Sequence, residues 1–548
     1  MKNWFYEIMA EETLESRPFF LNPFKQVLIL LLLGAVLFFP AYTGEWVWDD
    51  FSLIVLNKNV TDFSLNSLKS LLSHEYFYLP DYPACPGNVG YYRPLANVTY
   101  ALLYQVFGNK PFLFHLYGLF LHLMITLLLV RIGFQITSSG FISFLSGVVF
   151  FIHPVHHQAV YYITGIVDLQ AVLFGLFSFF LLQAYLAQPL KSKWKLGWSC
   201  ILYGCSIYTK EIAFLLPMIP FIFHSVRYKN VRRKKWHILL LYLPVPLSLF
   251  WIRKYILHLD WLPDGVLFHF LTYYGTIIQA FFRNIFQTIF PFRLWYFKSY
   301  IPLISNVSAW LWVGLFCGFF LLFIRLRKNQ VLTYAGIWFG LFYLPVSNFL
   351  PLAPCVAEKQ IYSPEHLLYL PSFGVYLLLI YAVVKGSQGN MLKQILPRLL
   401  LIYLAWTAIQ SFKTASLWHD SERLHLYQIQ QTPLRLDPYQ GLGYYYMIRG
   451  EYEKAQCYLN QGLSLPFEEK DKYFKTLTNM AQTQLVLGEV EKARQNLETV
   501  LSFWPENYFA LYLLGNIYLM RHQEEQAVHC FNEIKKIKPD FMSRQKNK

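Results

Sequence analysis

Long apolar stretches alternate with short polar segments over the first three quarters of the chain. The first stretch, Lys25–Ala41, follows a polar start and lacks a small-residue cleavage site, so we interpret it as an uncleaved span rather than a removed signal peptide. Ten more follow, near 111–131, 140–153, 170–187, 196–209, 212–225, 237–252, 303–324, 331–350, 369–384 and 395–412. Because a helix needs about 20 apolar residues to cross a bilayer, the pattern predicts an all-α, polytopic bundle of about eleven transmembrane spans.

The last quarter of the chain has a different pattern, in which small residues recur at a nearly fixed spacing. Ala455, Ala493 and Ala527 are spaced by 38 and 34 residues. Other positions share this register, namely Gly443 with Ala481 and Gly515, Tyr446 with Tyr518, Gly450 with Gly488, and Pro505 with Pro539. This resembles the tetratricopeptide repeat of 34 residues, with an insertion near Pro466–Lys470. We therefore predict an α-solenoid of about three repeats over 413–548, which would bind an extended peptide or a partner protein.

Composition separates the same two parts. The 548 residues are 55% hydrophobic and only 14% charged, whereas soluble proteins carry about a quarter charged residues. Residues 1–412 hold 30 basic and 16 acidic residues, and the remainder holds 17 and 16. The net charge of +15 therefore comes almost entirely from the apolar part. The seven cysteines form no CxxC pair, which disfavours a zinc or disulfide framework.

The basic residues predict a topology. If the N-terminal tail, 1–24, is cytoplasmic, five cytoplasmic loops hold 15 basic and no acidic residues; these are the loops with Arg131, Lys191–Lys195, Arg227–Lys235, Arg325–Lys328 and Lys385–Lys393. This agrees with the positive-inside rule, so the charge is a topology signal and does not indicate a nucleic-acid binder. The assignment requires 253–302 to stay on the outer side as a re-entrant or interfacial segment. It also makes the repeats extracytoplasmic and places all twelve acids that follow the tail within 25–412 in or beside outer loops.

The first outer loop, 42–110, holds the most informative acidic residues. The segment Gly44–Asp50 reads GEWVWDD and directly follows the first span. Asp49 and Asp50 could cap a helix. Alternatively, a carboxylate held near the membrane with an adjusted pKa could accept a proton. Trp46 and Trp48 would anchor the loop at the interface, or form a platform on which a sugar stacks.

Other polar residues stand at the ends of spans, and each has two interpretations. Arg93 lies among tyrosines, where it could snorkel or pair with a phosphate. Lys210 and Glu211 form either a local ion pair or a phosphate contact, and Glu365 with His366 either anchors a span or belongs to a head-group site. His115 and His122 share a face of the second span. Three histidines at 153, 156 and 157, followed by Asp168, could hold a divalent metal, but zinc sites show clearer spacing.

Seven of these motifs occur in an order that resembles a known family. They are Trp48-Asp49-Asp50, Tyr92-Arg93-Pro94-Leu95, Phe114-His115 through His122, His153-Pro154-Val155-His156 with Ala159-Val160, Thr209-Lys210-Glu211, Pro345-Val346-Ser347-Asn348, and Glu365-His366 through Ser372. With the repeats, they are similar to the GT-C class of multi-pass glycosyltransferases, specifically the transmembrane and tetratricopeptide-repeat protein O-mannosyltransferases and their bacterial relatives. The resemblance covers nearly the whole chain. It implies a GT-C catalytic domain over 25–412.

The resemblance also implies a mechanism. A sugar carried on a polyprenyl or dolichyl phosphate would move to an acceptor hydroxyl, typically Ser or Thr of a protein, on the extracytoplasmic side with inversion. Asp49 would be the base and Asp50 would orient it or the acceptor. The donor phosphate and sugar would be bound by residues among Arg93, His153, His156, Lys210, Glu211, Glu365 and His366. No cofactor is required, and a bound metal is a lesser alternative. The protein would reside in a bacterial inner membrane or the endoplasmic reticulum.

Two departures from the family pattern affect the donor site. Gln158 follows His157 where an acid is expected, and Gly165-Ile166-Val167-Asp168 lacks an expected arginine. Other function classes also stay open. The chain could be an inactive membrane-anchored repeat scaffold, or its acceptor could be a lipid or a polysaccharide. A transporter is disfavoured because charges stand at span ends and no repeat symmetry is visible within the apolar part.

Overall fold

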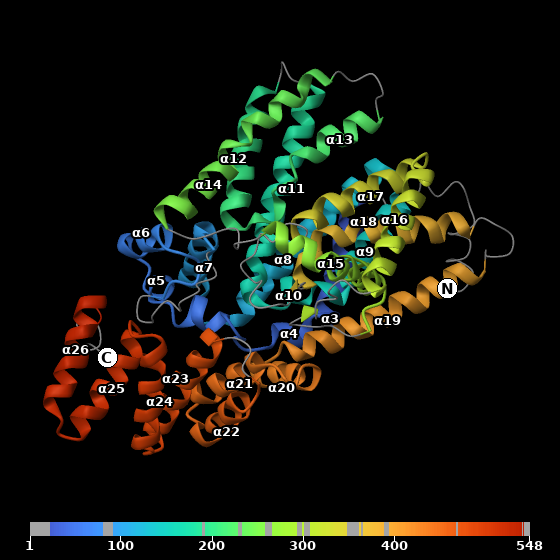
Figure 1. Ribbon diagram of the computed structural model, residues 1–548. Coiled ribbons are helices and arrows are strands. Elements are labelled where there is room, and N and C mark those ends of the chain that lie inside the picture. Colours follow the sequence, from blue (N-terminus) through green and yellow to red (C-terminus); the bar gives the residue numbers. More distant parts are fainter. Residues whose placement is uncertain are drawn as a thin grey trace. The chain divides into compact units, whose positions relative to one another are not determined.

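The computed structural model describes most of the chain, which is almost entirely helical (Figure 1). The described residues are 22–79, 91–188, 192–227, 233–257, 266–292, 299–300, 307–347, 361–362, 365–387, 394–466, 470–539 and 541. Among them, the only strands are β1 (Ser299–Tyr300) and β2 (Ile361–Tyr362), which pair antiparallel with Ser299 opposite Tyr362. The predicted all-α class is therefore confirmed.

The chain divides into two compact units that are interleaved in sequence. The first, which we call the membrane unit, comprises Met1–Gly44, Leu71–Tyr76 and Gly90–His419. The second, which we call the repeat unit, comprises Glu45–Ser70, Phe77–Val89 and Asp420–Lys548. The sequence predicted a division at 412. The structural division falls at His419 instead, and it groups much of the first outer loop, including Asp49 and Asp50, with the repeats.

Helical structure underlies every one of the eleven apolar stretches. The α-helices of the membrane unit are α3 (Pro23–Leu37), α4 (Phe39–Tyr42), α7 (Pro94–Phe107), α8 (Pro111–Thr137), α9 (Gly140–Ile152), α10 (His157–Val160), α11 (Ile166–Ala187), α12 (Lys193–Thr209), α13 (Met218–Arg227), α14 (Pro244–Trp251), α15 (Val266–Ile289), α16 (Val307–Leu326), α17 (Gln330–Tyr343), α18 (Tyr369–Gly386) and α19 (Ile395–Leu417). Short 3-10 segments join some of them: Pro154–His156, Ile163–Gly165, Glu211–Ala213, Arg233–Leu241, Leu344–Val346 and Glu365–Leu368. A π-helical turn, Ile252–Ile256, follows α14.

Fewer of these helices could cross a membrane than the sequence predicted. Among the described residues, six helical stretches are long and apolar enough to do so: Pro111–Thr137, Ile163–Ala187, Trp236–Ile256, Ala309–Leu326, Glu365–Gly386 and Ile395–Leu417. A seventh is possible if α9 and the segment Pro154–Val160, which meet at a bend of 51°, form one broken span. Other predicted spans form shorter helices, such as α3 and α17. The chain is thus a multi-pass membrane protein, but the number eleven is not confirmed.

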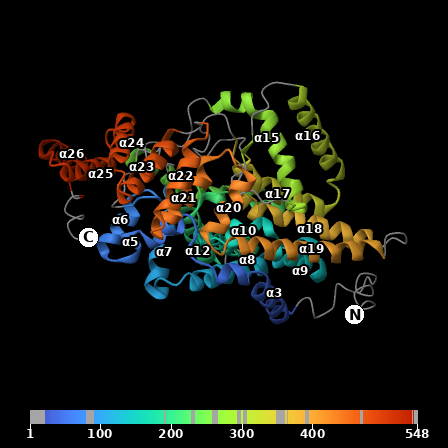
Figure 2. The same cartoon turned by 90° about the horizontal axis from the view of Figure 1, so that it is seen from below.

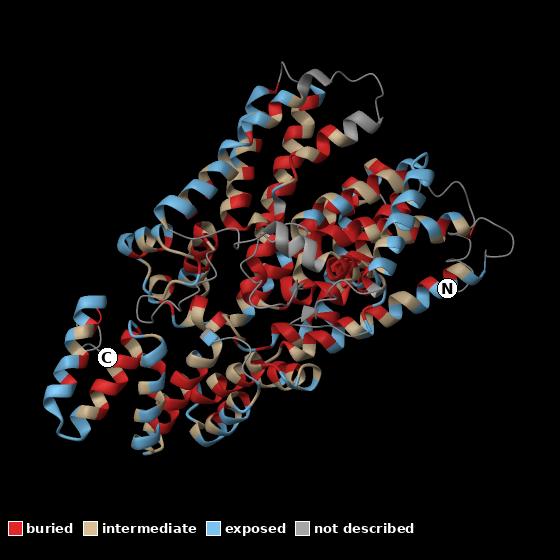
Figure 3. Cartoon of the chain, viewed as in Figure 1, coloured by how far each residue is buried: buried red, intermediate tan, exposed pale blue. Residues whose placement is uncertain are grey.

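The candidate spans differ in how much of each is buried by protein (Figure 3). The share of buried residues is 72% in the window of α11 and 61% in that of α8, but only 6% in that of α16. An apolar helix with so little protein around it needs lipid as its neighbour. Figures 1 and 2 show α18 alongside α19, with α8 and α9 close by. The buried part of the membrane unit therefore centres on α8, α9, α11 and α18.

Residues 253–302, predicted to remain on the outer side, contain α15. This helix has 24 residues, which is long enough to span, yet it is not among the six stretches selected by length and composition. Its Phe281 packs with Phe339, Tyr343 and Leu368. The outer placement of this segment stays a prediction that rests on the charges of the loops.

The repeat unit consists of short helices after the predicted first span and a helical array at the end of the chain. The α-helices are α5 (Lys58–Thr61), α6 (Leu65–Ser73, which begins in this unit), α20 (Ser421–Gln431), α21 (Leu436–Ile448), α22 (Tyr452–Leu463), α23 (Lys470–Val486), α24 (Val490–Phe503), α25 (Tyr508–Met520) and α26 (Glu524–Ile537). A π-helical turn, Phe51–Val55, precedes α5. Helices α21 to α26 form three consecutive antiparallel pairs that pack on one another.

The three helix pairs follow the register of the sequence repeat. Ala455, Ala493 and Ala527 are fully buried. Five positions before each of them, the turn between the paired helices has a positive φ: 76° at Gly450, 79° at Gly488 and 57° at His522. Glycine adopts this conformation at little cost, which explains its recurrence. The insertion predicted near 466–470 lies mostly outside the described residues, and the tetratricopeptide assignment itself rests on the sequence.

Candidate functional site

The paired aspartates lie in a tight turn of the repeat unit. The backbone N–H of Asp50 donates to the carbonyl of Val47 at 3.1 Å, and the N–H of Val47 donates to Oδ2 of Asp50 at 3.0 Å. Asp50 is only 1% exposed, whereas Asp49 is half-buried. Asp50 precedes the helical turn Phe51–Val55 but makes no side-chain capping bond to it. Its carboxylate instead closes the turn that carries Asp49.

Trp48 holds this turn in an unusual backbone conformation. Its φ is 57°, in the left-handed region that bulky residues rarely adopt. Such a conformation costs about 1–3 kcal/mol and persists only where the surroundings enforce it. Here the N–H of Trp48 donates to the hydroxyl of Ser421, the first residue of α20, at 3.3 Å. Backbone strain of this kind concentrates at functional sites, which favours a functional interpretation of the adjacent Asp49.

A group of buried and partly buried charged side chains lies in the membrane unit. We call it the charge cluster and define it as Arg93, Asp168, Lys210, Glu211 and Arg253. Arg93 donates to Oε2 of Glu211 through Nε at 3.2 Å and Nη2 at 3.0 Å. Nη1 of Arg253 lies 3.5 Å from the other carboxylate oxygen of Glu211, and Nζ of Lys210 lies 2.6 Å from Oδ1 of Asp168. The cluster thus contains three cations and two carboxylates.

Local sequence explains where each of these residues stands relative to its own helix. Pro94 opens α7, so Arg93 precedes the helix and is kept out of helical conformation. Asp168 stands in the first turn of α11, where the helix dipole favours a carboxylate. Lys210 ends α12 and Glu211 begins the 3-10 segment after it. Arg253, which the sequence analysis missed, lies in the π-helical turn after α14.

Burial and neighbouring charges shift the titration of the cluster. Burial lowers the pKa of Lys210 below its ordinary value, although Asp168 partly opposes the shift. Burial acts to raise the pKa of Glu211, but the charges of Arg93 and Arg253 and the hydrogen bonds to its carboxylate together outweigh burial, and the pKa falls. The pKa of Arg93 is raised: burial alone would lower it, but Glu211 and the rings of Tyr91 and Tyr76, 4.1 and 5.4 Å from its guanidinium, overcome that effect.

His366 adjoins this cluster and is positioned by Gln158. Its Nδ1 lies 2.9 Å from Oε1 of Gln158, and its backbone N–H donates to the same oxygen at 3.3 Å. His366 is near enough to Lys210, Asp168 and Arg93 for electrostatic interaction with all three. The structure therefore brings together four of the predicted donor-site residues, namely Arg93, Lys210, Glu211 and His366.

Glu365 is tied into a fully buried network beside His366. Oε2 of Glu365 lies 2.7 Å from Nε2 of His157, and both side chains are 0% exposed. Nε1 of Trp418 donates to Nδ1 of His157 at 3.1 Å. An indole N–H can only donate, so Nδ1 of His157 must accept and Nε2 carries the proton that it donates to Glu365. The amide of Gln287 donates to the other oxygen of Glu365. Glu365 is thus bound by protein donors.

The remaining predicted histidines lie elsewhere in the membrane unit. Nε2 of His156 lies 2.9 Å from the hydroxyl of Ser372, and its Nδ1 lies 2.9 Å from the carbonyl of Phe150. The ring centroid of His153 lies 4.9 Å from that of Tyr376. Both histidines are buried among aromatic rings, and their described contacts do not include the charge cluster. Within the described part of the chain, no group of three or more His, Cys, Asp or Glu side chains is placed to hold a metal ion.

Comparison with known proteins gives partial but consistent matches. No family model matches the chain. A segment of 244 residues is 27% identical to protein O-mannosyl-transferase TMTC2 of Mus musculus, covering 41% of this chain and 28% of the relative. A segment of 175 residues is 31% identical to protein O-mannosyl-transferase TMTC4 of Homo sapiens, covering 29% and 23%. Tmtc2 of Drosophila melanogaster is 26% identical over 206 residues. The chain resembles the TMTC protein O-mannosyl-transferases.

This TMTC resemblance spans less than a third of each relative's length. One departure from the pattern expected for the TMTC group has a structural counterpart. Gln158, which stands in place of an expected acid, presents its amide oxygen to both nitrogen donors of His366. The Thr209-Lys210-Glu211 motif identified Lys210 and Glu211 as candidate donor-site residues. No motif identified Arg253, which lies in the segment that the sequence analysis interpreted as an outer-side loop.

Proposed function

We propose that this chain is a membrane glycosyltransferase that moves a hexose, such as mannose, from a polyprenyl or dolichyl phosphate to a hydroxyl group of a protein. Its relatives are named protein O-mannosyl-transferases, which supports the reaction class and a protein acceptor. The observation that carries the proposal is the charge cluster. A largely buried group with three cations and two carboxylates has a formal excess of one positive charge, and a phosphate would balance it.

The cluster has the chemistry of a phosphate site. The guanidinium of Arg93 is fixed by Glu211 and by the faces of Tyr91 and Tyr76, so it is oriented before a ligand arrives. Lys210 supplies a second cation held near it by Asp168. Guanidinium and ammonium groups are the common phosphate ligands in proteins. In the proposed reaction these cations stabilise the negative charge that develops on the lipid phosphate as it leaves.

Asp49 acts as the proposed general base. The acceptor oxygen attacks the anomeric carbon, the bond between that carbon and the phosphate oxygen breaks, and the hydroxyl proton passes to Asp49. The leaving phosphate keeps the electron pair, and the anomeric configuration inverts because the acceptor oxygen attacks from the face opposite the phosphate. The different environments of the two aspartates support this role. The carboxylate of Asp50 accepts the Val47 N–H and fixes the turn, while Asp49 is the more exposed of the two.

The side of the membrane and the acceptor follow from sequence features. The loop charges favour an extracytoplasmic reaction, because they place the segment with Asp49 and the repeats outside. Solenoids of stacked helix pairs offer extended surfaces that suit peptides. We therefore propose that the repeat unit presents an unfolded or extended segment of the acceptor protein.

Transfer by the purified full-length protein tests the proposal. The protein in nanodiscs receives polyprenyl-phosphate mannose and a Ser/Thr-rich peptide, and mass spectrometry follows the addition of a hexose. Asp49→Asn should reduce transfer at least a hundredfold, because a positioned base typically contributes about 10²–10⁴. Asp62→Asn is the matched control, since Asp62 is an exposed aspartate in the same unit. Undiminished transfer by the Asp49 variant would refute its role, and transfer to lipid but not peptide would refute the protein acceptor.

A further inference from the structure

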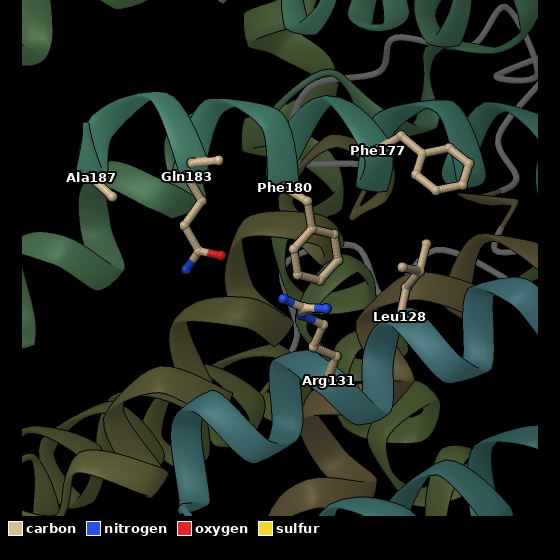
Figure 4. A pocket seen from close by; sticks show the side chains of 7 residues that line it. Leu128, Arg131, Phe177, Phe180, Gln183 and Ala187 are labelled. Atoms are coloured by element: carbon tan, nitrogen blue, oxygen red, sulfur yellow. The ribbon is translucent and has the colours of Figure 1, made fainter. Parts of the chain in front are cut away.

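A groove of about 410 Å³ lies between α8 and α11, apart from the charge cluster (Figure 4). Its lining residues are Leu128, Arg131, Phe177, Phe180, Gln183, Ala184 and Ala187. All of them belong to the carboxyl-terminal halves of two helices that pass as membrane spans. The groove therefore lies on the surface of the membrane unit, at the carboxyl-terminal end of both spans.

Arg131 is the one charged side chain in the groove lining. Figure 4 shows its guanidinium reaching from α8 over the ring of Phe180 on α11, and the distance to the ring centroid is 5.5 Å. Arg131 is exposed, and it forms no ion pair with any residue that the structure describes. This differs from Arg93 and Arg253, which both contact Glu211. An uncompensated cation held against an aromatic face leaves its other side available to an anion.

A pair of amides fixes the polar end of the groove. Nε2 of Gln135 donates to Oε1 of Gln183 at 3.1 Å, and Nε2 of Gln183 donates to Oε1 of Gln135 at 2.9 Å. Gln135 lies one helical turn beyond Arg131, so both face α11. The amide pair fastens the helices to each other next to the cation. The rest of the lining is apolar, and the small side chains of Ala184 and Ala187 leave room along α11.

We propose that this groove binds one anionic phospholipid, with its phosphate against Arg131 and one acyl chain along Leu128, Phe177 and Phe180. The occupant follows from the surroundings and the charge. A groove on two membrane spans opens toward lipid, an apolar lining matches a hydrocarbon chain, and the lone cation matches a negatively charged head group. This site is separate from the proposed donor site and holds whether or not the chain transfers sugar.

The site also has a physical effect on the membrane unit. A lipid that spans the groove contacts both α8 and α11, so its binding stabilises their packing beyond what the Gln135–Gln183 pair provides. The loop charges predict that the Arg131 end faces the cytoplasm, where anionic lipids concentrate in many membranes. We therefore expect the unit to be more heat-resistant in bilayers that contain anionic phospholipid than in those without it.

Native mass spectrometry of the full-length protein measures lipid retention directly. The protein is released from micelles that contain equal amounts of phosphatidylglycerol and phosphatidylcholine. Wild type should retain one phosphatidylglycerol in preference. Arg131→Gln should reduce that retention about fivefold, because a basic residue near the surface contributes about 1 kcal/mol toward an anionic lipid. Arg131→Lys should keep most of it. Arg325→Gln is the matched control, because Arg325 is an exposed arginine in the last turn of another span, α16.

A second variant tests the groove rather than the charge. Ala184→Trp fills the space beside Phe180 and should also reduce retention, although Arg131 remains. An unchanged elution volume and melting temperature for Arg131→Gln establish that it folds. Equal retention by wild type and Arg131→Gln would overturn the proposal, as would equal retention of both lipids. In a parallel measurement with polyprenyl phosphate added to the micelles, its retention in preference to phosphatidylglycerol would assign the groove to the sugar donor and overturn the proposal. Competition by inorganic phosphate alone would show a simple anion contact and would also overturn it.

Discussion

Ion pairs stand in two different settings in this molecule. In the charge cluster of the membrane unit, Lys210 and Asp168 are 2.6 Å apart and their side chains are 11% and 5% exposed. In the repeat unit, Arg494 and Glu491 are also 2.6 Å apart, but their side chains are 27% and 48% exposed. The distance between the charged atoms is the same, but the pairs differ in residue type and in how much water reaches them.

The difference in exposure distinguishes surface charges, which favour solubility, from buried charges, which indicate a ligand site. An exposed pair adds little stability, because water screens it and holding two long side chains costs entropy. A buried pair loses several kcal/mol of hydration per ion, which its own attraction hardly offsets. The membrane unit keeps five charged side chains in one group, three of them buried and two partly buried, so it gives up stability at that point. Such an arrangement is typical of ligand sites and supports the proposed phosphate role.

Breaking the buried side of the comparison should have the largest effect on stability. Glu211→Gln leaves Arg93 and Arg253 without their carboxylate, and we expect a loss of about 3 kcal/mol in the free energy of unfolding. The pKa of Glu211 is lowered in the folded protein, so its stabilisation is present above the ordinary value of 4.5 and is lost as the pH falls through the lowered value. At pH 7 in detergent, the apparent melting temperature of Glu211→Gln should therefore be lower than that of wild type. This difference should become smaller in acid.

The Lys210–Asp168 pair allows stability and function to be separated. Lys210→Met alone should destabilise by about 3 kcal/mol, because Asp168 becomes an unpaired buried carboxylate. Adding Asp168→Asn removes that charge, so the double variant should recover to within about 1 kcal/mol of wild type. Sugar transfer should stay low in both, since both lack the cation. Restored transfer in the stable double variant would remove Lys210 from the phosphate site.

The sequence predicted the helices well because each helix depends on local pattern. Every apolar stretch lies on helical structure, and the residue register of the repeats recurs in three helix pairs with matching positive-φ turns. The number of spans was less predictable, since several apolar stretches form helices, such as α3 and α17, that are shorter than a crossing of the membrane requires. Hydrophobic periodicity reports a segment's own surroundings but not which distant segment it meets.

The site shows the same limit more sharply. Arg93 and Glu211 are 118 residues apart, and only the family resemblance suggested that they belong together. The same resemblance grouped His153 and His156 with them, yet these side chains contact Ser372, Phe150 and Tyr376 instead. Arg253 could not be predicted, because a single arginine after an apolar run carries no signal of its partner. Tertiary packing decides which charged side chains meet.

A smaller effect should appear in the pH dependence of transfer. Burial lowers the pKa of Lys210 below its ordinary 10.5, so the lysine loses its proton, and with it its hold on the phosphate, at a lower pH than an exposed lysine would. The alkaline limb of the rate profile should therefore lie below pH 10.5. Lys210→Arg keeps its charge throughout this range and should shift the limb upward. An identical limb in wild type and variant would assign it to another group.

The exposed side of the comparison should give the smallest effect. Glu491 accepts from both Arg494 and Arg521, and these hydrogen bonds lower its pKa to about 2. Its contribution is therefore present above the ordinary 4.5 and lost toward acid, but solvent screens it at every pH. We expect Glu491→Gln to leave the melting midpoint of the repeat unit almost unchanged. Gly488→Ala is the positive control, because it forces alanine to a φ of 79° and should lower that midpoint measurably. If Glu491→Gln destabilised as much as Glu211→Gln, burial would not distinguish the charge cluster from the surface ion pairs of the repeat unit. The main support for a ligand at the charge cluster would then be lost.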